Sequence, residues 1–264
     1  MLKINNLNLT FNKGTVLENH VLKNINLQLN SGDYVTVIGG NGAGKSTLLS
    51  SVAGTFPVDT GSITIDGANV TRLPEHRRAA YLGRVFQDPM LGSVANMNIE
   101  ENLALAYRRG AKRKLRWYIT SLERKIYQEL LATLELGLET RMADKVGLLS
   151  GGQRQALTLL MATLNKPRLL LLDEHTAALD PKTAPKVLEV GDKIINQHHL
   201  TAMMVTHNMR DAIRHGNRLI MMSGGRIVLD IAGAEKQKLT VSELVARFNQ
   251  VSNEEFVDDK ALLG

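Results

Sequence analysis

Eight consecutive residues constrain this chain more than any others. Residues 39–46 read Gly-Gly-Asn-Gly-Ala-Gly-Lys-Ser and match the pattern G-x-x-x-x-G-K-[ST]. A compact β-rich run at residues 34–38 precedes them, and a helix is predicted from about residue 45 to residue 53. Glycines let successive backbone N–H groups turn inward, and the helix start adds its positive dipole end, so such a loop holds phosphate. The chain is therefore predicted to be a phosphate-binding α/β protein.

The last residues of this loop point to a nucleotide with its metal. Lys45 places a positive charge on the β and γ phosphates, and Ser46 offers a hydroxyl to Mg²⁺. A glycine turn followed by a surface lysine is the alternative, and the flanking strand and helix argue against it. We predict a site for ATP and Mg²⁺ that contains Gly39, Gly40, Asn41, Gly42, Ala43, Gly44, Lys45, Ser46 and Thr47.

Two carboxylates follow another apolar run. Residues 169–172 are four leucines, and Asp173 and Glu174 come directly after them. In open α/β sheets, ligands bind at the carboxyl ends of the strands. Asp173 can hold Mg²⁺ through a water molecule, and Glu174 can polarise the water that attacks the phosphate. Taken alone, the run is explained equally well as a strand that ends in a polar turn.

A third motif, Leu-Ser-Gly-Gly-Gln at residues 149–153, precedes an apolar helical run. Ser150 is a good helix N-cap, and the two glycines allow a second backbone nest for an anion. An ordinary helix start is the alternative. Physical reasoning alone does not explain why one chain needs two phosphate-binding loops.

These motifs, in this order, resemble the nucleotide-binding subunits of ABC transporters over residues 1 to about 250. In that family LSGGQ is the signature loop, and two subunits pair head to tail. Each ATP then lies between one chain's phosphate loop and the other chain's signature. The resemblance implies that a second copy of this chain is a partner, and that its nucleotide contacts Ser150, Gly151, Gly152 and Gln153.

The resemblance also assigns roles to single residues. Phe11 matches the aromatic residue that stacks on adenine, although a plain core phenylalanine explains it too. Gln87 matches the loop that contacts Mg²⁺ or water and senses the membrane partner. Asp180 matches the loop that links the two active sites, and His207 matches the switch histidine at the γ-phosphate. The implied catalytic set is Glu174, His207, Lys45 and Gln87, with Ser46, Gln87 and Asp173 at the metal.

Two positions depart from the family's pattern. Proline usually follows the catalytic glutamate, but His175 stands there, and we expect a looser turn. The helix after the signature begins Arg154-Gln155 and lacks the family's usual arginine, so its ion pairs must differ.

Alternating strand and helix signals predict an α/β, P-loop NTPase fold of the ABC-ATPase type, with a mainly parallel core sheet and an antiparallel β subdomain. An edge strand is expected at residues 2–9. A second strand at residues 21–29 alternates, with Val21, Lys23, Ile25, Leu27 and Leu29 on one face. Further strands are expected at 34–38, 62–66, 82–86, 168–172, 201–205, 218–222 and 226–230. Residues 98–165, with helices at 102–107, 121–136 and 152–165, form an inserted helical subdomain. The core is 1–97 with 166–250, and an acidic, poorly ordered tail follows at 251–264.

Composition narrows the remaining possibilities. The 264 residues include no cysteine, which excludes disulfides and thiolate metal sites. No secretory signal or apolar window long enough to cross a bilayer is visible. The net charge of +6 is largely local, so no nucleic-acid partner is expected. Six cations gather before Trp117 and Tyr118: Arg108, Arg109, Lys112, Arg113, Lys114 and Arg116. They form either a solvated helix end or a contact with anionic lipid headgroups.

The resemblance implies an ATPase that powers transport from the cytoplasmic face of the membrane. It would dock on a separate multi-span permease and work with an extracellular solute-binding protein. Residues 105–110 and 173–180 look most like those of bacterial importers proposed for aromatic amino acids such as tryptophan or tyrosine. A non-transport ABC ATPase, for example of the iron–sulfur assembly type, is the main alternative. A simple P-loop kinase is a second, but it has no use for LSGGQ or Asp180.

Overall fold

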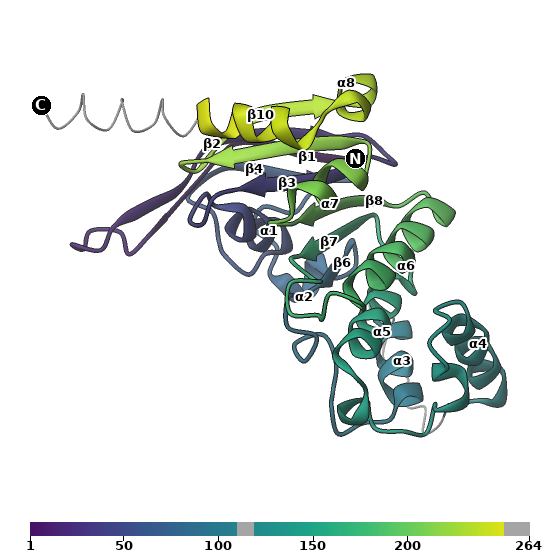
Figure 1. Ribbon diagram of the computed structural model, residues 1–264. Helices are drawn as coiled ribbons and strands as arrows, with labels where there is room; N and C mark the ends of the chain where they lie inside the picture. The colour runs from purple at the N-terminus through teal and green to yellow at the C-terminus, as the bar shows by residue number, and fades with distance from the viewer. Residues whose placement is uncertain (110–118, 251–264) are drawn as a thin grey trace, which may run out of the picture. The chain divides into compact units, whose positions relative to one another are not determined.

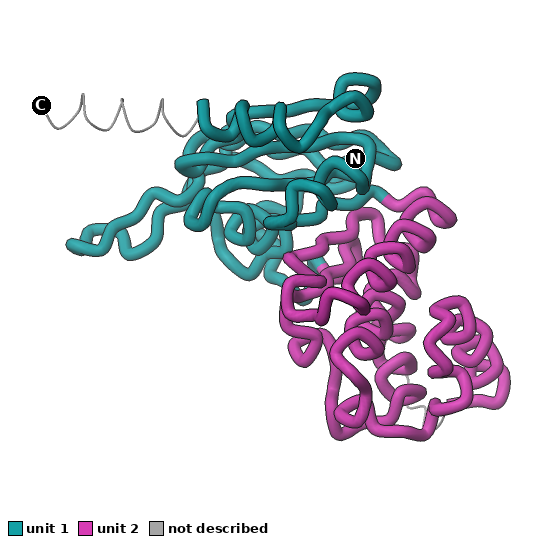
Figure 2. Tube along the Cα trace, in the orientation of Figure 1, with its two compact units in different colours: residues 1–78, 201–264 teal, residues 79–200 magenta. Residues whose placement is uncertain are grey.

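The computed structural model describes residues 1–109 and 119–250 (Figure 1). Contacts divide the chain into two compact units (Figure 2). Unit 1 comprises residues 1–78 and 201–264, and unit 2 comprises residues 79–200. The subdomain boundaries expected at residues 98 and 165 remain a prediction, and the tail at 251–264 lies outside the described residues.

Unit 1 contains an antiparallel sheet of four strands. These are β1 (Leu2–Phe11), β2 (Asn19–Leu29), β4 (Thr60–Ile65) and β5 (Ala68–Asn69), in the order β2-β1-β4-β5. Because β1 pairs with both β2 and β4, the prediction of an edge strand is wrong. The imperfect alternation of β1 comes instead from an irregularity between Ile4 and Leu7, where Asn6 has a φ of 47°.

The alternation of β2 changes phase at Asn24, whose φ is 52°. Beyond this residue, Ile25, Leu27 and Leu29 are buried as predicted. Before it, Leu22 is the buried residue, so the prediction for Val21 and Lys23 is wrong. Leu9 of β1 pairs with Leu22 and Leu7 pairs with Ile25, so β2 carries the extra residue of a bulge.

A second group of strands in unit 1 surrounds β3 (Tyr34–Gly39). β3 pairs in parallel with β8 (Thr201–Val205) on one side and with β9 (Arg218–Ser223) on the other, and β10 (Arg226–Ala232) pairs antiparallel with β9. The helices of this unit include α1 (Lys45–Ala53), α2 (Glu75–Arg78), α7 (Met209–Arg214) and α8 (Gly233–Lys238), and residues 241–250 are helical as well. One apolar cluster joins Ile38 of β3 to Leu219 and Met221 of β9 and to Ala212 of α7. This packing holds β3 in place up to the start of the glycine loop.

Unit 2 combines two parallel strands with helices. β6 (Leu82–Val85) pairs with β7 (Leu169–Asp173). The helices are α3 (Ile99–Tyr107), α4 (Ser121–Ala132), α5 (Gly151–Thr163) and α6 (Ala184–Gln197), with 3-10 turns at Leu138–Thr140 and Val146–Leu148. α4 ends four residues before the predicted end, because Glu135 and Gly137 take positive φ angles of 56° and 71°. The predicted fold class, α/β with parallel core strands, an antiparallel sheet and a helix-rich segment, is confirmed.

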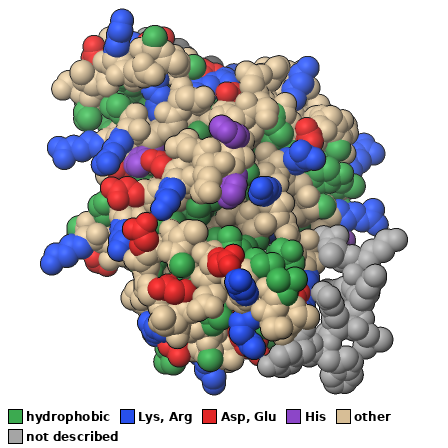
Figure 3. All heavy atoms as spheres, turned by 90° about the vertical axis from the view of Figure 1, so that its right-hand side faces the viewer, with side chains coloured by type: hydrophobic (Ala, Val, Ile, Leu, Met, Phe, Trp, Pro, Cys, Tyr) green, Lys and Arg blue, Asp and Glu red, His purple; other side chains and the backbone are tan. Residues whose placement is uncertain are grey.

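The surface of one side of the molecule carries charges of both signs. In Figure 3, Lys and Arg side chains are interspersed with Asp and Glu side chains over the face that is drawn. Among the described residues, the charges on this face are therefore mixed and not gathered into a single basic patch.

Candidate functional site

The glycine loop of unit 1 approaches its neighbours too closely for any side chain at two positions. A Cβ atom at Gly39 would lie 2.2 Å from the carbonyl oxygen of Met222, and one at Gly44 would lie 2.9 Å from that of Val21. Both glycines also have positive φ angles, of 152° and 94°. The motif therefore requires glycine here for packing against β9 and β2 as well as for backbone conformation.

Lys45 begins α1 and its side chain folds back over the loop. Its Nζ donates to the carbonyl oxygens of Gly39 and Gly40, each at 2.9 Å, and the residue is only 5% exposed. The N-cap, Gly44, has no side chain that could bond the first N–H groups of α1. An ammonium group beside a helix start of this kind suits a bound anion.

His207 is carried to the same end of the unit as the loop. Val37 of β3 pairs with Val205 of β8, and the strands are parallel. Gly39 and His207 therefore each lie two residues beyond this pair, at the carboxyl edge. The N–H of Thr206 donates to the carbonyl of Val37 at 3.1 Å, which continues the pairing to the residue before His207. Unit 1 thus brings together two of the sites predicted from the sequence.

Phe11 lies at the end of β1 and is partly buried. Its ring packs edge-to-face on Phe56, with the centroids 5.1 Å apart and an interplanar angle of 79°. This contact determines the orientation of the ring, and adenine stacking stays a prediction.

In unit 2, parallel strand pairing also places predicted site residues at the carboxyl edge of two strands. Val85 of β6 pairs with Leu172 of β7 in parallel, so Gln87 and Glu174 each lie two residues beyond the pair. The Nη2 atom of Arg84 lies 3.6 Å from the Oδ2 atom of Asp173. The guanidinium carbon of Arg84 lies 4.6 Å from the ring centroid of Phe86.

Glu174 has a φ of 45°, in the left-handed region that a non-glycine residue rarely adopts. Such a conformation costs on the order of 1–3 kcal/mol and persists only where the surroundings impose it. The N–H of Ala177 donates to the carbonyl of Glu174 at 2.9 Å, so the turn is closed. His175, in the position where proline is usual, is 2% exposed.

Ser150 caps α5, as predicted. Its hydroxyl accepts from the N–H of Gln153, and the Gln153 side-chain oxygen accepts from the N–H of Ser150 at 3.2 Å. This reciprocal pair is a capping box. It determines where the helix begins and leaves the role of residues 150–153 at a nucleotide as a prediction.

Thr183 is a residue that the sequence reasoning missed, and it joins two predicted loops. A Cβ atom at Gly152 would lie 1.9 Å from the Cγ2 atom of Thr183. The hydroxyl of Thr183 also donates to Asp180 at 2.5 Å, and its N–H donates to the same carboxylate at 3.0 Å. These bonds, the hydroxyl first, lower the pKa of the Asp180 carboxyl. The signature loop and the Asp180 loop are thus packed together within unit 2.

Two further residues of α5 were missed. Gln155, with no exposed surface, donates from Nε2 to the carbonyl of Phe86 at 3.1 Å. Arg154 donates to three backbone carbonyls of the segment before the signature, those of Val146, Gly147 and Leu149. No local sequence signal marks the contact of Gln155, because its partner is 69 residues away.

The first two cations of the basic stretch have partners within unit 2. Arg108 pairs with Glu123 at 3.2 Å. Arg109 donates to the carbonyl of Ala162 at 3.0 Å, and burial lowers the pKa of its guanidinium. The other four cations, with Trp117 and Tyr118, lie outside the described residues, so the choice between the solvated and lipid-contacting interpretations stays open.

Residues 1–109 and 119–250 are the described part of the chain. Over these ranges no helix combines the length and the apolar character that a bilayer crossing requires. The same ranges contain no cluster of three or more His, Asp or Glu side chains arranged to hold a metal ion.

Comparison with known proteins gives consistent results. The sequence profile described as "ABC transporter" matches residues 22–177. The chain is 43% identical over 252 residues to a tyrosine transport ATP-binding protein of Clostridioides difficile, covering 94% of this chain and 98% of that protein. It is 34% identical to the spermidine/putrescine import ATP-binding protein PotA of Haemophilus influenzae, of which it spans 59%.

Solved structures agree with the sequence matches. The ATP-binding cassette MJ0796, in a dimeric post-hydrolysis state bound to ADP and Pi, superposes with a TM-score of 0.74 at 29% identity. The match covers 88% of this chain and 98% of that one.

Proposed function

Because this chain belongs to the ABC transporter family as an ATP-binding subunit that hydrolyses ATP to drive transport, we propose that it powers the import of an aromatic amino acid such as tyrosine. The observation that carries the finer proposal is the 43% identity, over nearly the full length of both chains, to the tyrosine transport protein. Relatives named for polyamine or thiamine import are 34% and 32% identical.

The residues of unit 1 are proposed to hold the triphosphate. The N–H groups of residues 39–47 surround its oxygens, and the Lys45 ammonium, which now bonds the Gly39 and Gly40 carbonyls, turns to the β and γ phosphates. His207, on the strand beside β3, contacts the γ-phosphate. Phe11 stacks on the adenine.

The residues of unit 2 are proposed to supply the chemistry. The Glu174 carboxylate accepts the proton of the attacking water, and its left-handed backbone determines the direction in which the side chain leaves β7. Gln87, at the same strand edge, orients that water. Ser46, Gln87 and Asp173 are oxygen ligands of the kind that Mg²⁺ prefers. When bound, Mg²⁺ would neutralise charge on the β and γ phosphates.

A second copy of this chain is proposed to complete each site with its residues 150–153. The contact between Gly152 and Thr183, together with the bonds from Thr183 to Asp180, supports this proposal. A partner nucleotide that displaces the signature loop would displace the Asp180 loop as well. The similar cassette of known structure is itself a dimer.

A separate permease is proposed to dock on the segment that follows Gln87. Four of its side chains are apolar and exposed over 37–69% of their surface: Met90, Leu91, Val94 and Met97. An apolar cluster of this kind marks a site of protein contact. The ATPase would then lie at the cytoplasmic face of the membrane, and an extracellular solute-binding protein would complete the import system.

Co-purification and reconstitution test this function. The chain should co-purify with a hydrophobic multi-span protein. In vesicles, the ATPase activity of that complex should rise with tyrosine and its binding protein but not with spermidine or thiamine. Co-purification with scaffold proteins of iron–sulfur assembly, and no membrane partner, would favour the non-transport alternative. Stimulation by another solute alone would overturn the assignment of the solute.

A further inference from the structure

Arg78 is a buried cation whose side-chain hydrogen bonds, among the residues that the structure describes, all run to backbone carbonyls. The residue is 2% exposed and donates from Nη1 to Ser51 and Val52, from Nε to Leu73, and from Nη2 to Thr71, at 2.7–2.9 Å. No carboxylate pairs with it among the residues that the structure describes. Burial lowers the pKa of its guanidinium. An unpaired buried charge is costly, so these four bonds must hold it firmly.

Two of the four acceptors belong to the phosphate-loop helix. Ser51 and Val52 lie in the last turn of α1, where carbonyls run out of intrahelical partners, and the Ser51 carbonyl also accepts from the N–H of Gly54 at 3.3 Å. A cation at this end also complements the negative end of the helix dipole. The opposite end of α1 begins at Lys45 of the phosphate loop. Arg78 therefore holds the rear of the helix whose front is proposed to hold ATP.

Gly54, directly after α1, shows how closely the guanidinium packs. Its φ is 90°, and a Cβ atom there would lie 2.7 Å from the Nε atom of Arg78. A side chain at this position would push the guanidinium away from α1. Glycine at position 54 therefore leaves room for the Arg78 guanidinium.

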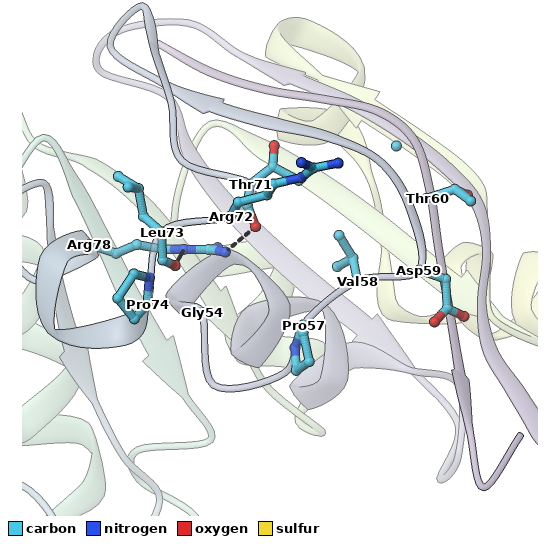
Figure 4. Close-up of a pocket in the computed structure, with 11 residues that line it drawn as sticks. Gly54, Pro57, Val58, Asp59, Thr60, Thr71, Arg72, Leu73, Pro74 and Arg78 are labelled. Atoms are coloured by element: carbon cyan, nitrogen blue, oxygen red, sulfur yellow. Dashed lines mark hydrogen bonds between the residues drawn. The ribbon is translucent and has the colours of Figure 1, made fainter.

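The other two acceptors, Thr71 and Leu73, come from the segment that leads to α2. This segment and the end of α1 line a cavity of about 540 Å³, which Arg78 borders together with Gly54, Pro57 and Pro74 (Figure 4). Figure 4 shows the dashed bonds from Arg78 to Leu73 and Thr71 beside this space. Because Arg78 lines this cavity, its position would open to the cavity in a variant that lacks the side chain.

Arg78 is also the last residue of unit 1 before the chain continues into unit 2 at Ala79. We propose that Arg78 is a positioning residue for ATP binding, because it fastens the C-terminal end of α1 to the point where the chain leaves unit 1. α1 is a rigid rod of nine residues, about 13 Å long, so a displaced rear end tilts the front end. The proposal rests on the proposed role of residues 39–47 in binding ATP.

Arg78→Met tests it, because methionine fills similar space without donors. Direct titration with a fluorescent ATP analogue, well below the unfolding temperature, should show a dissociation constant raised on the order of tenfold. The KM for ATP should rise likewise, whereas kcat should change by less than about threefold. Arg77→Met, an exposed neighbour on the same helix, is the matched control and should bind as the wild type does.

Chemical rescue separates positioning from general stability. In Arg78→Ala, low-millimolar guanidinium should enter the cavity and restore ATP affinity, whereas equal sodium chloride should not. If that variant does not fold, Gly54→Ala tests the same contact and should also weaken ATP binding. ATP affinity within about twofold of wild type in Arg78→Met, with only a lowered melting temperature, would overturn the proposal. Wild-type protein that does not bind ATP would instead overturn the proposed function.

Discussion

The side-chain Nε2 atom of Gln155 lies 3.1 Å from the carbonyl oxygen of Phe86, and the side chain of Gln155 is completely buried. Its Oε1 atom has no hydrogen-bond partner among the described residues, so the bond to Phe86 alone orients the amide. This bond ties α5, which begins at the signature loop, to the residue before Gln87. A displacement of the segment proposed to contact the permease would therefore displace α5 as well.

Gln155→Leu should destabilise the protein by about 1–3 kcal/mol, because the partly buried Phe86 carbonyl would lose its donor. Urea unfolding measures the loss. Thr163→Val is the control on the same helix, since the Thr163 hydroxyl donates only to Leu159 and Leu160 of α5. Equal stability losses in the two variants would show that the bond to Phe86 contributes no more to stability than a hydrogen bond within α5.

Glu174→Gln should keep ATP binding and lower turnover by about 100-fold or more, because the amide cannot accept the proton of the attacking water. The variant should also accumulate as an ATP-bound dimer, which light scattering after gel filtration detects. Glu129→Gln, at an exposed position on α4 in the same unit, should turn over normally. Normal turnover of Glu174→Gln would remove this residue from the role of general base.

Two inactive variants should restore activity when they are mixed. Lys45→Ala damages the phosphate loop and Ser150→Arg damages the signature loop. If each site uses the phosphate loop of one copy and the signature of another, a mixed dimer contains one intact site. ATPase activity should then reappear in the mixture, and it should rise with protein concentration. A mixture as inactive as its components would argue that both loops serve a site within one chain.

Tyr127→Phe should leave the protein as stable at neutral pH or stabilise it by about 1 kcal/mol, because the fully buried hydroxyl has no partner among the described residues. Burial, more than the nearby charge of Glu123, raises the pKa of Tyr127 to about 12. The unfolded chain ionises near pH 10, so the wild type loses stability as the pH rises from about 10 to 12.

Urea unfolding at pH 7 and at pH 11 measures this difference. The advantage of Tyr127→Phe should widen at pH 11, where the variant has no phenol to ionise. Tyr107→Phe, at a position 42% exposed, is the control and should change the neutral-pH stability by less than about 0.5 kcal/mol. A variant that unfolds more easily than wild type at both pH values would indicate that the hydroxyl has a stabilising partner.

Local features of the site could be predicted from the sequence. The bounds of α1 were predicted correctly, as was Ser150 as the cap of α5, because helix starts depend on residues within one turn. The strand ends that carry Glu174 and His207 followed from short apolar runs that end in polar residues. Their assembly at a common edge within each unit follows from parallel pairing.

Contacts between distant residues could not be predicted. β1 was expected at an edge because its alternation is broken, yet the break is a local irregularity in a strand with two neighbours. In the same way, Asn24 reverses the buried face of β2 without any signal in the alternation of residues 21–29. The alternation of apolar and polar residues predicts which residues of one strand share a face. It does not predict which strands pair, because the partner strands lie elsewhere in the chain.

The sequence by itself therefore determined the glycine loop, the LSGGQ motif and the polar strand ends, because each is a contiguous pattern with a local physical cause, and the order of these motifs indicated the family. The tertiary structure alone decided which groups support them. Arg78 behind α1, Thr183 between the signature and Asp180, and Gln155 beside Phe86 act through backbone and side-chain groups that folding brings near them. A hydrogen bond requires two groups about 3 Å apart, and only the folded chain supplies that distance.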